Sequence, residues 1–232
     1  MTTRRDLLKG LLGAGVVGLG EGRLRAAKPV PSVIRVGLDL PPGAAARGAA
    51  LAGDEARQTA GLLGTRFELT TAGAANLFAV VGWRAPAEEP RTLFLVAGPP
   101  GDAPAPVRRV FQVGSDPLFR REALARKGGK GFRALDWHPD LKRFGAEQLN
   151  ERYLRRFGMP MDEAAWRGWV AVKIAAELAL RNAGADPTAE RFDGHKGVQL
   201  RFDPDDHTLI QPVYIVDGKG KLVGRAVPEG EE

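Results

Sequence analysis

The stretch between Leu135 and Leu180 constrains the fold most, because it carries two consecutive amphipathic helices joined by a turn. In the first helix, apolar residues recur at helical spacing and share one broad face. They are Leu141, Phe144, Leu149, Tyr153 and Phe157. Gly158 favours the left-handed conformation that ends a helix, and Pro160 prevents the helix from resuming. The pattern therefore predicts a first helix that ends beside Phe157.

The second helix is predicted to begin after Asp162, which stands where an N-cap belongs, with Glu163 in the first turn. Its apolar face also follows helical spacing. The residues of this face are Trp166, Trp169, Val170, Ile174 and Leu178. Alanines occupy much of the remaining surface, so the helix is thin enough to pack closely against a sheet. Lys173 and Glu177 are spaced to form an i,i+4 ion pair on its surface.

The first 27 residues resemble a twin-arginine export signal. Arg4 and Arg5 precede two leucines and Lys9, and a glycine-rich apolar run follows. This run of about 10 residues is too short to span a bilayer, which needs about 20. The alternative interpretation is a basic N-terminus before a core helix. The order of these elements favours a signal peptide over residues 1–27 and a periplasmic protein over residues 28–232.

Charge and cysteine content exclude several classes of function. The chain has a formal net charge of +6, of which residues 1–27 contribute +3. We find no run of basic residues interleaved with aromatic ones, so we do not expect nucleic-acid binding. The sequence contains no cysteine, which excludes disulfides, thiolate nucleophiles and cysteine-ligated metals. We expect neither a cofactor nor a metal.

From residue 33 onward the chain alternates apolar strands with helices. The strands are predicted at 33–40, 66–71, 79–83, 92–98 and 107–113, with helices at 45–62, 73–78 and 115–127. A strand–helix–strand unit of this kind forms a parallel sheet with a right-handed crossover. Residues 197–202 alternate as a strand, and 212–224 predict a hairpin around Asp217–Lys221. The fold class is therefore α/β, a mostly parallel sheet flanked by helices with a C-terminal β-hairpin.

These pieces, in this order, resemble the substrate-binding proteins of branched-chain amino-acid-type ABC transporters, which have the type I periplasmic binding fold. The residues that carry the resemblance lie within 33–72 and 132–224. They include Ile34–Gly37, Leu63–Leu69, Tyr153–Pro160, Gly168–Val172 and Val216–Lys219. The tryptophan-rich version of the second helix is most similar to a branch that accompanies PQQ-dependent alcohol oxidation.

The resemblance implies an exported protein that binds a small molecule in the periplasm and presents it to a membrane permease. Residues 73–131 are too short to hold the family's complete second lobe, so we expect a reduced form of the fold. Val170 replaces the acidic residue of the family's Gly-Tyr-Asp motif, and the Ser/Thr-rich loops that hold a ligand carboxylate have no clear counterpart. An amino-acid ligand is therefore not implied.

Ligands of open parallel sheets bind beyond the carboxyl ends of the strands. The predicted lining residues at these ends are Asp39, Leu40, Thr71 and Gly98. Trp137 and Trp169 are candidates to stack on a planar or apolar ligand, and the alternative is that tryptophans on an apolar helix face belong to the core.

Catalytic chemistry finds little support. Asp203, Asp205, Asp206 and His207 are the densest group of metal-ligand types, but their spacing matches no established calcium or zinc loop, and a solvated turn is the alternative. His195 is expected in an exposed loop. Gly114–Ser115 lacks the Gly-x-Ser-x-Gly elbow of serine hydrolases. We predict that the protein is not an enzyme. The competing hypothesis for its function is an accessory or interaction protein of a periplasmic quinoprotein dehydrogenase.

Overall fold

The computed structural model describes residues 31–99, 107–181 and 186–230. The segment predicted as a signal peptide lies outside the described residues. The helices are α2 (Ala44–Leu62), α3 (Pro117–Arg126), α4 (Ala146–Phe157) and α5 (Glu163–Leu180), with a short 3₁₀ turn at Pro187–Ala189. The strands are β1 (Val33–Asp39), β2 (Arg66–Thr71), β3 (Ala79–Gly82), β4 (Leu93–Val96), β5 (Val110–Gln112), β6 (Arg133–Leu135), β7 (Phe192–Asp193), β8 (Gln199–Phe202), β9 (Leu209–Ile210), β10 (Val213–Val216) and β11 (Leu222–Ala226).

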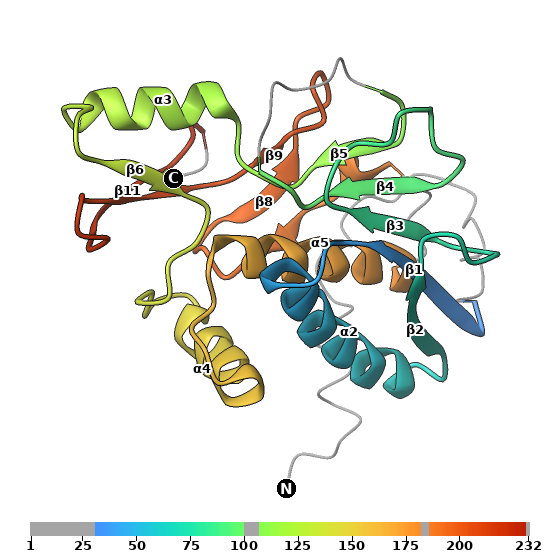
Figure 1. The fold of residues 1–232 in the computed structure, drawn as a ribbon. Coiled ribbons are helices and arrows are strands. Elements are labelled where there is room, and N and C mark those ends of the chain that lie inside the picture. The colour runs from blue at the N-terminus through green and yellow to red at the C-terminus, as the bar shows by residue number, and fades with distance from the viewer. Residues whose placement is uncertain (1–30, 100–106, 182–185, 231–232) are drawn as a thin grey trace, which may run out of the picture.

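The main sheet has five parallel strands in the order β2-β1-β3-β4-β5 (Figure 1). The predicted α/β class with a mostly parallel sheet is thus confirmed. The predicted hairpin is also present, as β10 paired antiparallel with β11, and β6 joins its other edge. A third small sheet, β7-β8-β9, lies between these two units.

Helices α2 and α5 cross on one face of the main sheet, and two glycines allow their close contact. A Cβ on Gly48 would lie 1.8 Å from the carbonyl oxygen of Ala165, and a Cβ on Gly168 would lie 2.1 Å from that of Ala45. Any side chain at either position would therefore separate the helices. Their packing buries apolar residues of β1, β3 and β4 in the largest core cluster of the protein.

The caps of α4 and α5 follow the local sequence. Gly158 adopts φ 69° at the end of α4, and the Asp162 carboxylate accepts a hydrogen bond from the backbone N–H of Ala165 at 2.8 Å. The Asp116 carboxylate likewise caps α3 by accepting from the N–H groups of Leu118 and Phe119. The predicted end of α4 and start of α5 are confirmed, whereas α3 is slightly shorter than the helix predicted at 115–127.

The start of α4 differs from the prediction. The helix begins at Ala146, and Phe144 lies outside it, because Phe144 and Gly145 both have positive φ angles, of 60° and 82°. Two left-handed residues in succession cannot continue a right-handed helix. Leu141 still packs against the core, whereas Phe144 is 53% exposed. The predicted helical face is therefore correct only from Leu149 onward.

Two other segments also differ. Residues 73–78 form turns rather than the predicted short helix. Asn76 has φ 57°, and Leu77 lies so close to β1 that a Cβ on Gly37 would come within 2.8 Å of its Cδ1. The left-handed conformation of Asn76 is incompatible with a right-handed helix at this point. The strand predicted at 107–113 is shortened to β5, because Arg109 adopts φ 70° within a turn.

Candidate functional site

The carboxyl ends of the five parallel strands meet at one edge of the main sheet. The chain runs from β1 to β2 on one side and from β3 to β5 on the other, so the strand order reverses between β1 and β3. In open α/β sheets this switch point is where a crevice forms. Asp39 pairs with Gly82 across it, and the backbone N–H of Trp83 donates to the Asp39 carbonyl at 2.9 Å.

The structure brings four predicted residues to this edge. Asp39 and Thr71 end β1 and β2 and are exposed, and Leu40 follows Asp39. Gly98 lies beyond β4 and is buried, and a Cβ on it would come within 1.9 Å of the Trp83 carbonyl oxygen. Its own carbonyl accepts from the Gln112 side chain at 3.2 Å. Gly98 thus serves a close approach of two backbone segments.

Trp83 is a residue of this edge that the sequence reasoning missed. It directly follows β3 beside the switch point, and its side chain is half-buried. Trp83 therefore presents part of an aromatic ring at this edge, whereas Trp137 and Trp169, which were predicted to stack on a ligand, are buried. The rule that selected Asp39, namely the residues at the carboxyl end of a predicted parallel strand, would also have selected Trp83, the last residue of the strand predicted at 79–83.

Trp137 and Trp169 lie in the core, each 1% exposed. The Trp137 indole N–H donates to the side-chain oxygen of Asn150 at 2.9 Å, and its ring stacks on Trp166. The Trp169 indole N–H donates to Glu55 at 2.8 Å. Both N–H groups are satisfied inside the protein, and neither ring lines the cavities of about 490 and 480 Å³ found in the described residues. The prediction that these rings stack on a ligand is therefore corrected: the alternative, a core role, describes them.

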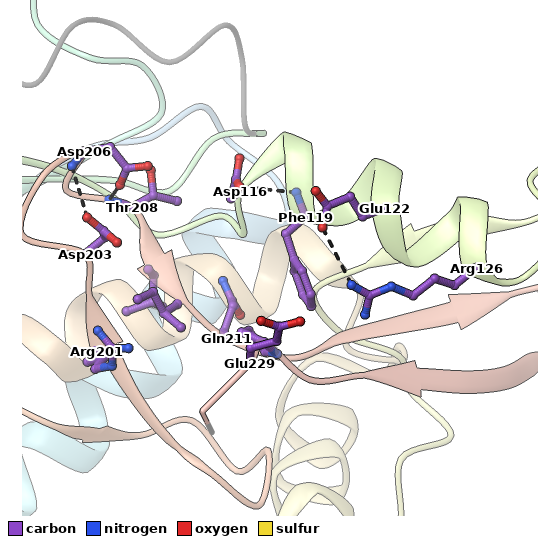
Figure 2. A pocket seen from close by; sticks show the side chains of 13 residues that line it. Asp116, Phe119, Glu122, Arg126, Arg201, Asp203, Asp206, Thr208, Gln211 and Glu229 are labelled. Atoms are coloured by element: carbon purple, nitrogen blue, oxygen red, sulfur yellow. Dashed lines mark hydrogen bonds and ion pairs between the residues drawn. The ribbon is translucent and has the colours of Figure 1, made fainter. Parts of the chain in front are cut away.

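A cavity of about 490 Å³ lies beyond the carboxyl end of β5. Gln112, the last residue of β5, forms a parallel bridge with Thr208, so the chain from Thr208 to Gln211 continues alongside the end of the strand. Three walls enclose the cavity: one face of α3 along its whole length, the segment from β8 through β9, and residues 228–229 (Figure 2). Its volume falls within the range of small-molecule sites, about 300–1,000 Å³.

Gln211 forms the buried floor of this cavity, with 1% of its surface exposed. Its side-chain N–H donates to the Val113 carbonyl at 2.7 Å, and its side-chain oxygen accepts from Lys196 Nζ at 2.5 Å. The amide is thus held at both ends. A floor fixed in this way is preorganised, which lowers the entropic cost of binding.

Lys196 connects the floor to the interior. It is fully buried, its Nζ also donates to the Pro212 carbonyl at 3.0 Å, and it lies 3.9 Å from the centre of the Trp166 ring. Burial lowers the pKa of Lys196 to about 7, although the nearby Asp136 opposes that shift. The sequence around Lys196 resembles a loop, so nothing in it predicted that this lysine is buried.

Behind Lys196 lies a buried ion network. Asp136 is 0% exposed and sits between Arg120, 2.8 Å away, and Arg167, 3.1 Å away. Glu163 contacts the same two arginines and accepts from the backbone N–H of Asp136 at 2.7 Å. Burial alone would raise the pKa of Asp136, but Arg120, Lys196 and Arg167 outweigh burial and hold that pKa below its usual value.

The histidines and aspartates considered for metal chemistry have local structural contacts. The Asp203 carboxylate accepts from the backbone N–H of Asp205 at 2.8 Å, and that of Asp206 accepts from Thr208 N–H at 2.7 Å, which is the pattern of a turn. The His207 ring stacks on Phe111. His195 was expected in an exposed loop, but its ring stacks on Trp169 and is half-buried. Burial lowers the pKa of His195.

The sequence matches no protein-family model and no curated protein. Several solved structures are nevertheless similar. A periplasmic binding protein from Burkholderia mallei has a TM-score of 0.68 at 10% identity, over 85% of this chain and 96% of its own. A Desulfitobacterium hafniense ABC transporter substrate-binding protein in complex with Leu has a TM-score of 0.63 at 14% identity, over 82% and 100%.

A third similar structure, a solute-binding protein of an ABC transporter from Rhodopseudomonas palustris, was solved with 3,4-dihydroxybenzoic acid. Its TM-score is 0.53 at 10% identity, over 85% of this chain and 96% of its own. The fold is that of the type I periplasmic binding proteins. It is present in a shortened form of 232 residues. Among the described residues, no helix combines the length and apolar character needed to cross a membrane.

Proposed function

We propose that this protein is the exported solute-binding component of an ABC transporter, which binds a small molecule in the periplasm and delivers it to a membrane permease. The observation that carries this proposal is the cavity of about 490 Å³ at the carboxyl side of the parallel sheet. Proteins of similar fold were solved with leucine and with 3,4-dihydroxybenzoic acid bound. The cavity lies on the carboxyl side of the sheet, where ligands of open α/β sheets bind, but it is beside the edge strand β5 rather than at the switch point between β1 and β3.

The site we propose combines this cavity with the edge next to it. Gln112 joins the two, because its backbone bridges to Thr208 while its side chain donates to the carbonyl of Gly98. Asp39, Leu40 and Thr71 lie farther along the same edge, together with Trp83. A ligand that extends from the cavity along the edge would contact them.

Export by the twin-arginine route is part of the proposal and depends on residues 1–27. A fusion of these residues to a reporter that is active only after folded export would test it. Replacing Arg4 and Arg5 by lysines should abolish export. Export that survives this change would contradict the assignment.

A thermal-shift screen of the purified chain tests solute binding. It would cover amino acids, short carboxylates, alcohols, aromatic acids, amines and PQQ. A ligand at about 100 times its Kd adds about 2.7 kcal/mol to the stability. That corresponds to several degrees of melting temperature for a chain of this length. A shift with one chemical class supports the proposal, and a flat screen on a cooperatively folding protein overturns it.

One feature favours the competing function, an accessory protein of a periplasmic quinoprotein dehydrogenase. A second cavity of about 480 Å³ contains the exposed ring of Phe144 and the apolar residues Leu141, Leu222 and Val223, together with four charged side chains. Exposed apolar surface of this kind marks protein contacts. Co-elution of the purified chain with a purified PQQ-dependent alcohol dehydrogenase, lost in Phe144→Ser, would support this function. Separate elution of the two proteins at micromolar concentration would exclude a stable complex.

A further inference from the structure

The cavity beyond β5 is strongly acidic although the chain as a whole is basic. Five carboxylates and two guanidinium groups line it, an excess of three negative charges. The carboxylates belong to Asp116, Glu122, Asp203, Asp206 and Glu229. One of the guanidinium groups, that of Arg126, lies 3.8 Å from Glu122. In a chain with 34 basic and 28 acidic residues, this excess is a local property of the cavity.

Thr208 provides a second, independent indication of a ligand. The residue lines the cavity and is only 5% exposed, yet its hydroxyl has no hydrogen-bond partner among residues 31–99, 107–181 and 186–230. The Thr208 hydroxyl is not one of the fully buried side-chain atoms that lack a partner, so it is accessible from the cavity. A ligand group that donates a hydrogen bond into the cavity would satisfy it.

The positions of the carboxylates favour an organic cation over a metal ion as the ligand. In the part of the chain that the structure describes, no three His, Asp or Glu side chains converge closely enough to hold a metal. Instead, Asp203 and Asp206 lie on one side of the cavity, while Glu122 and Glu229 lie on the other, near the Phe119 ring and Gln211 (Figure 2). Such separated charges suit a ligand that carries positive charge at more than one point.

The apolar part of the lining suits the carbon chain of such a ligand. The Phe119 ring extends from α3 toward Gln211, and Leu209, Ile210 and Pro228 complete the apolar surface. Burial of an aliphatic chain against such a surface is favourable, because it removes methylene groups from water. An aromatic ring can also attract an ammonium group that lies over its face.

We propose that this cavity binds a small aliphatic di- or polyamine, with its ammonium groups at the carboxylates of opposite walls and its methylenes on the apolar lining. This inference rests on the proposed solute-binding function and names the chemical class of the solute. The Thr208 hydroxyl and the fixed Gln211 amide would accept hydrogen bonds from an ammonium group that reaches the floor.

Isothermal titration of the purified chain with 1,4-diaminobutane and 1,5-diaminopentane at low ionic strength tests the inference. The diols of equal length and glutarate serve as neutral and anionic controls. We expect the diamines to bind and the controls not to bind. The diamine affinity should fall as salt is added, because these charges are partly exposed.

Three variants place the binding in the cavity. Glu229→Gln removes one carboxylate at an exposed position and should weaken diamine binding about 3- to 10-fold. Thr208→Val removes the hydroxyl and should also weaken it several-fold, whereas Thr208→Ser should restore it. Glu88→Gln, in the exposed loop between β3 and β4, removes a charge outside the cavity and should leave the affinity unchanged.

Diamine affinity that is equal in the unmodified chain, Glu229→Gln and Thr208→Val would overturn the inference. A neutral or anionic solute that binds in place of diamines would also overturn it, while leaving the proposed function intact. If neither the amines nor the wider screen yields a ligand, both proposals fail together.

Discussion

The parallel-sheet half of the molecule and the part around α3 are held together by different forces. In the first, α2 and α5 meet through glycine and alanine backbones over an apolar sheet face. In the second, ion pairs of Arg120 with the buried Asp136 and the partly buried Glu163 join α3, β6 and α5, beside a small apolar cluster between α3, β6 and β10. The apolar contact depends on shape, and the ionic contact depends on charge balance. The candidate cavity lies beside the ionic part, where a floor of fixed polar groups is available.

The largest effect is expected where the charge balance is broken. Asp136→Ala would leave Arg120 and Arg167 with only Glu163 to balance them in a buried site. Removal of one partner from a buried ion pair costs about 3–5 kcal/mol. We expect a loss of that order in the free energy of unfolding, measured by urea denaturation. Asp140→Ala, at an exposed position, should change it by less than about 0.5 kcal/mol. A loss below about 1 kcal/mol in Asp136→Ala would show that the network is not a stabilising contact.

A somewhat smaller effect is expected where the shape is disturbed. Gly168→Ala places a methyl group against the carbonyl of Ala45 and forces α2 and α5 apart. Overpacking of this kind costs about 1–3 kcal/mol. Gly61→Ala, in α2, is a matched control, because no atom outside the helix's own backbone and its chain neighbours lies within 4 Å of its new Cβ. The control should be neutral or stabilised by up to about 1 kcal/mol. Equal melting temperatures for the two variants would contradict the close helix contact.

The last prediction concerns pH, and it separates Lys196 from the rest of the network. Burial lowers the pKa of Lys196 in the folded chain to about 7, whereas in the unfolded chain it has the usual value of 10.5. Between these two pH values the unfolded chain therefore binds one more proton than the folded chain. Stability should therefore rise with pH across this window, by at most about 1.4 kcal/mol per unit. Lys196→Met should flatten the rise, as measured by urea denaturation between pH 7 and about 10.

Other titrating groups act outside this window. Burial raises the pKa of Tyr214 to about 12, so its ionisation in the unfolded chain lowers stability only above about pH 10. The pKa of His195 is lowered from 6.5, so this residue lowers stability only as the pH falls below that value. A slope that persists unchanged in Lys196→Met would show that another group is responsible.

Local features of the fold were predictable because they depend on neighbouring residues alone. Asp162 and Gly158 cap their helices through backbone geometry that the residue type dictates. The Lys173–Glu177 ion pair forms at its predicted i,i+4 spacing. The meeting of Asp39, Thr71 and Gly98 at one sheet edge followed from the parallel strands, since parallel strands share their carboxyl edge.

Features that depend on distant partners were not predictable. The Trp169 indole N–H pairs with Glu55, 114 residues away, and the Trp137 ring stacks on Trp166. Periodicity could place the tryptophans of α5 on an apolar face, but it could not show whether that face met a helix or a ligand. Phe144 fits a helical pattern and yet adopts a left-handed conformation, which no single-residue preference indicates.

The sequence by itself determined the α/β class, the main helices and the parallel edge where a ligand site belongs, because these follow from periodicity and from the conformational preferences of capping residues. The tertiary structure alone decided that Lys196 and Asp136 are buried together, that Gln211 is fixed between Val113 and Lys196, and that five carboxylates surround one cavity. The physical reason is that burial and electrostatic pairing depend on distances between segments far apart in the chain, which local sequence patterns do not encode.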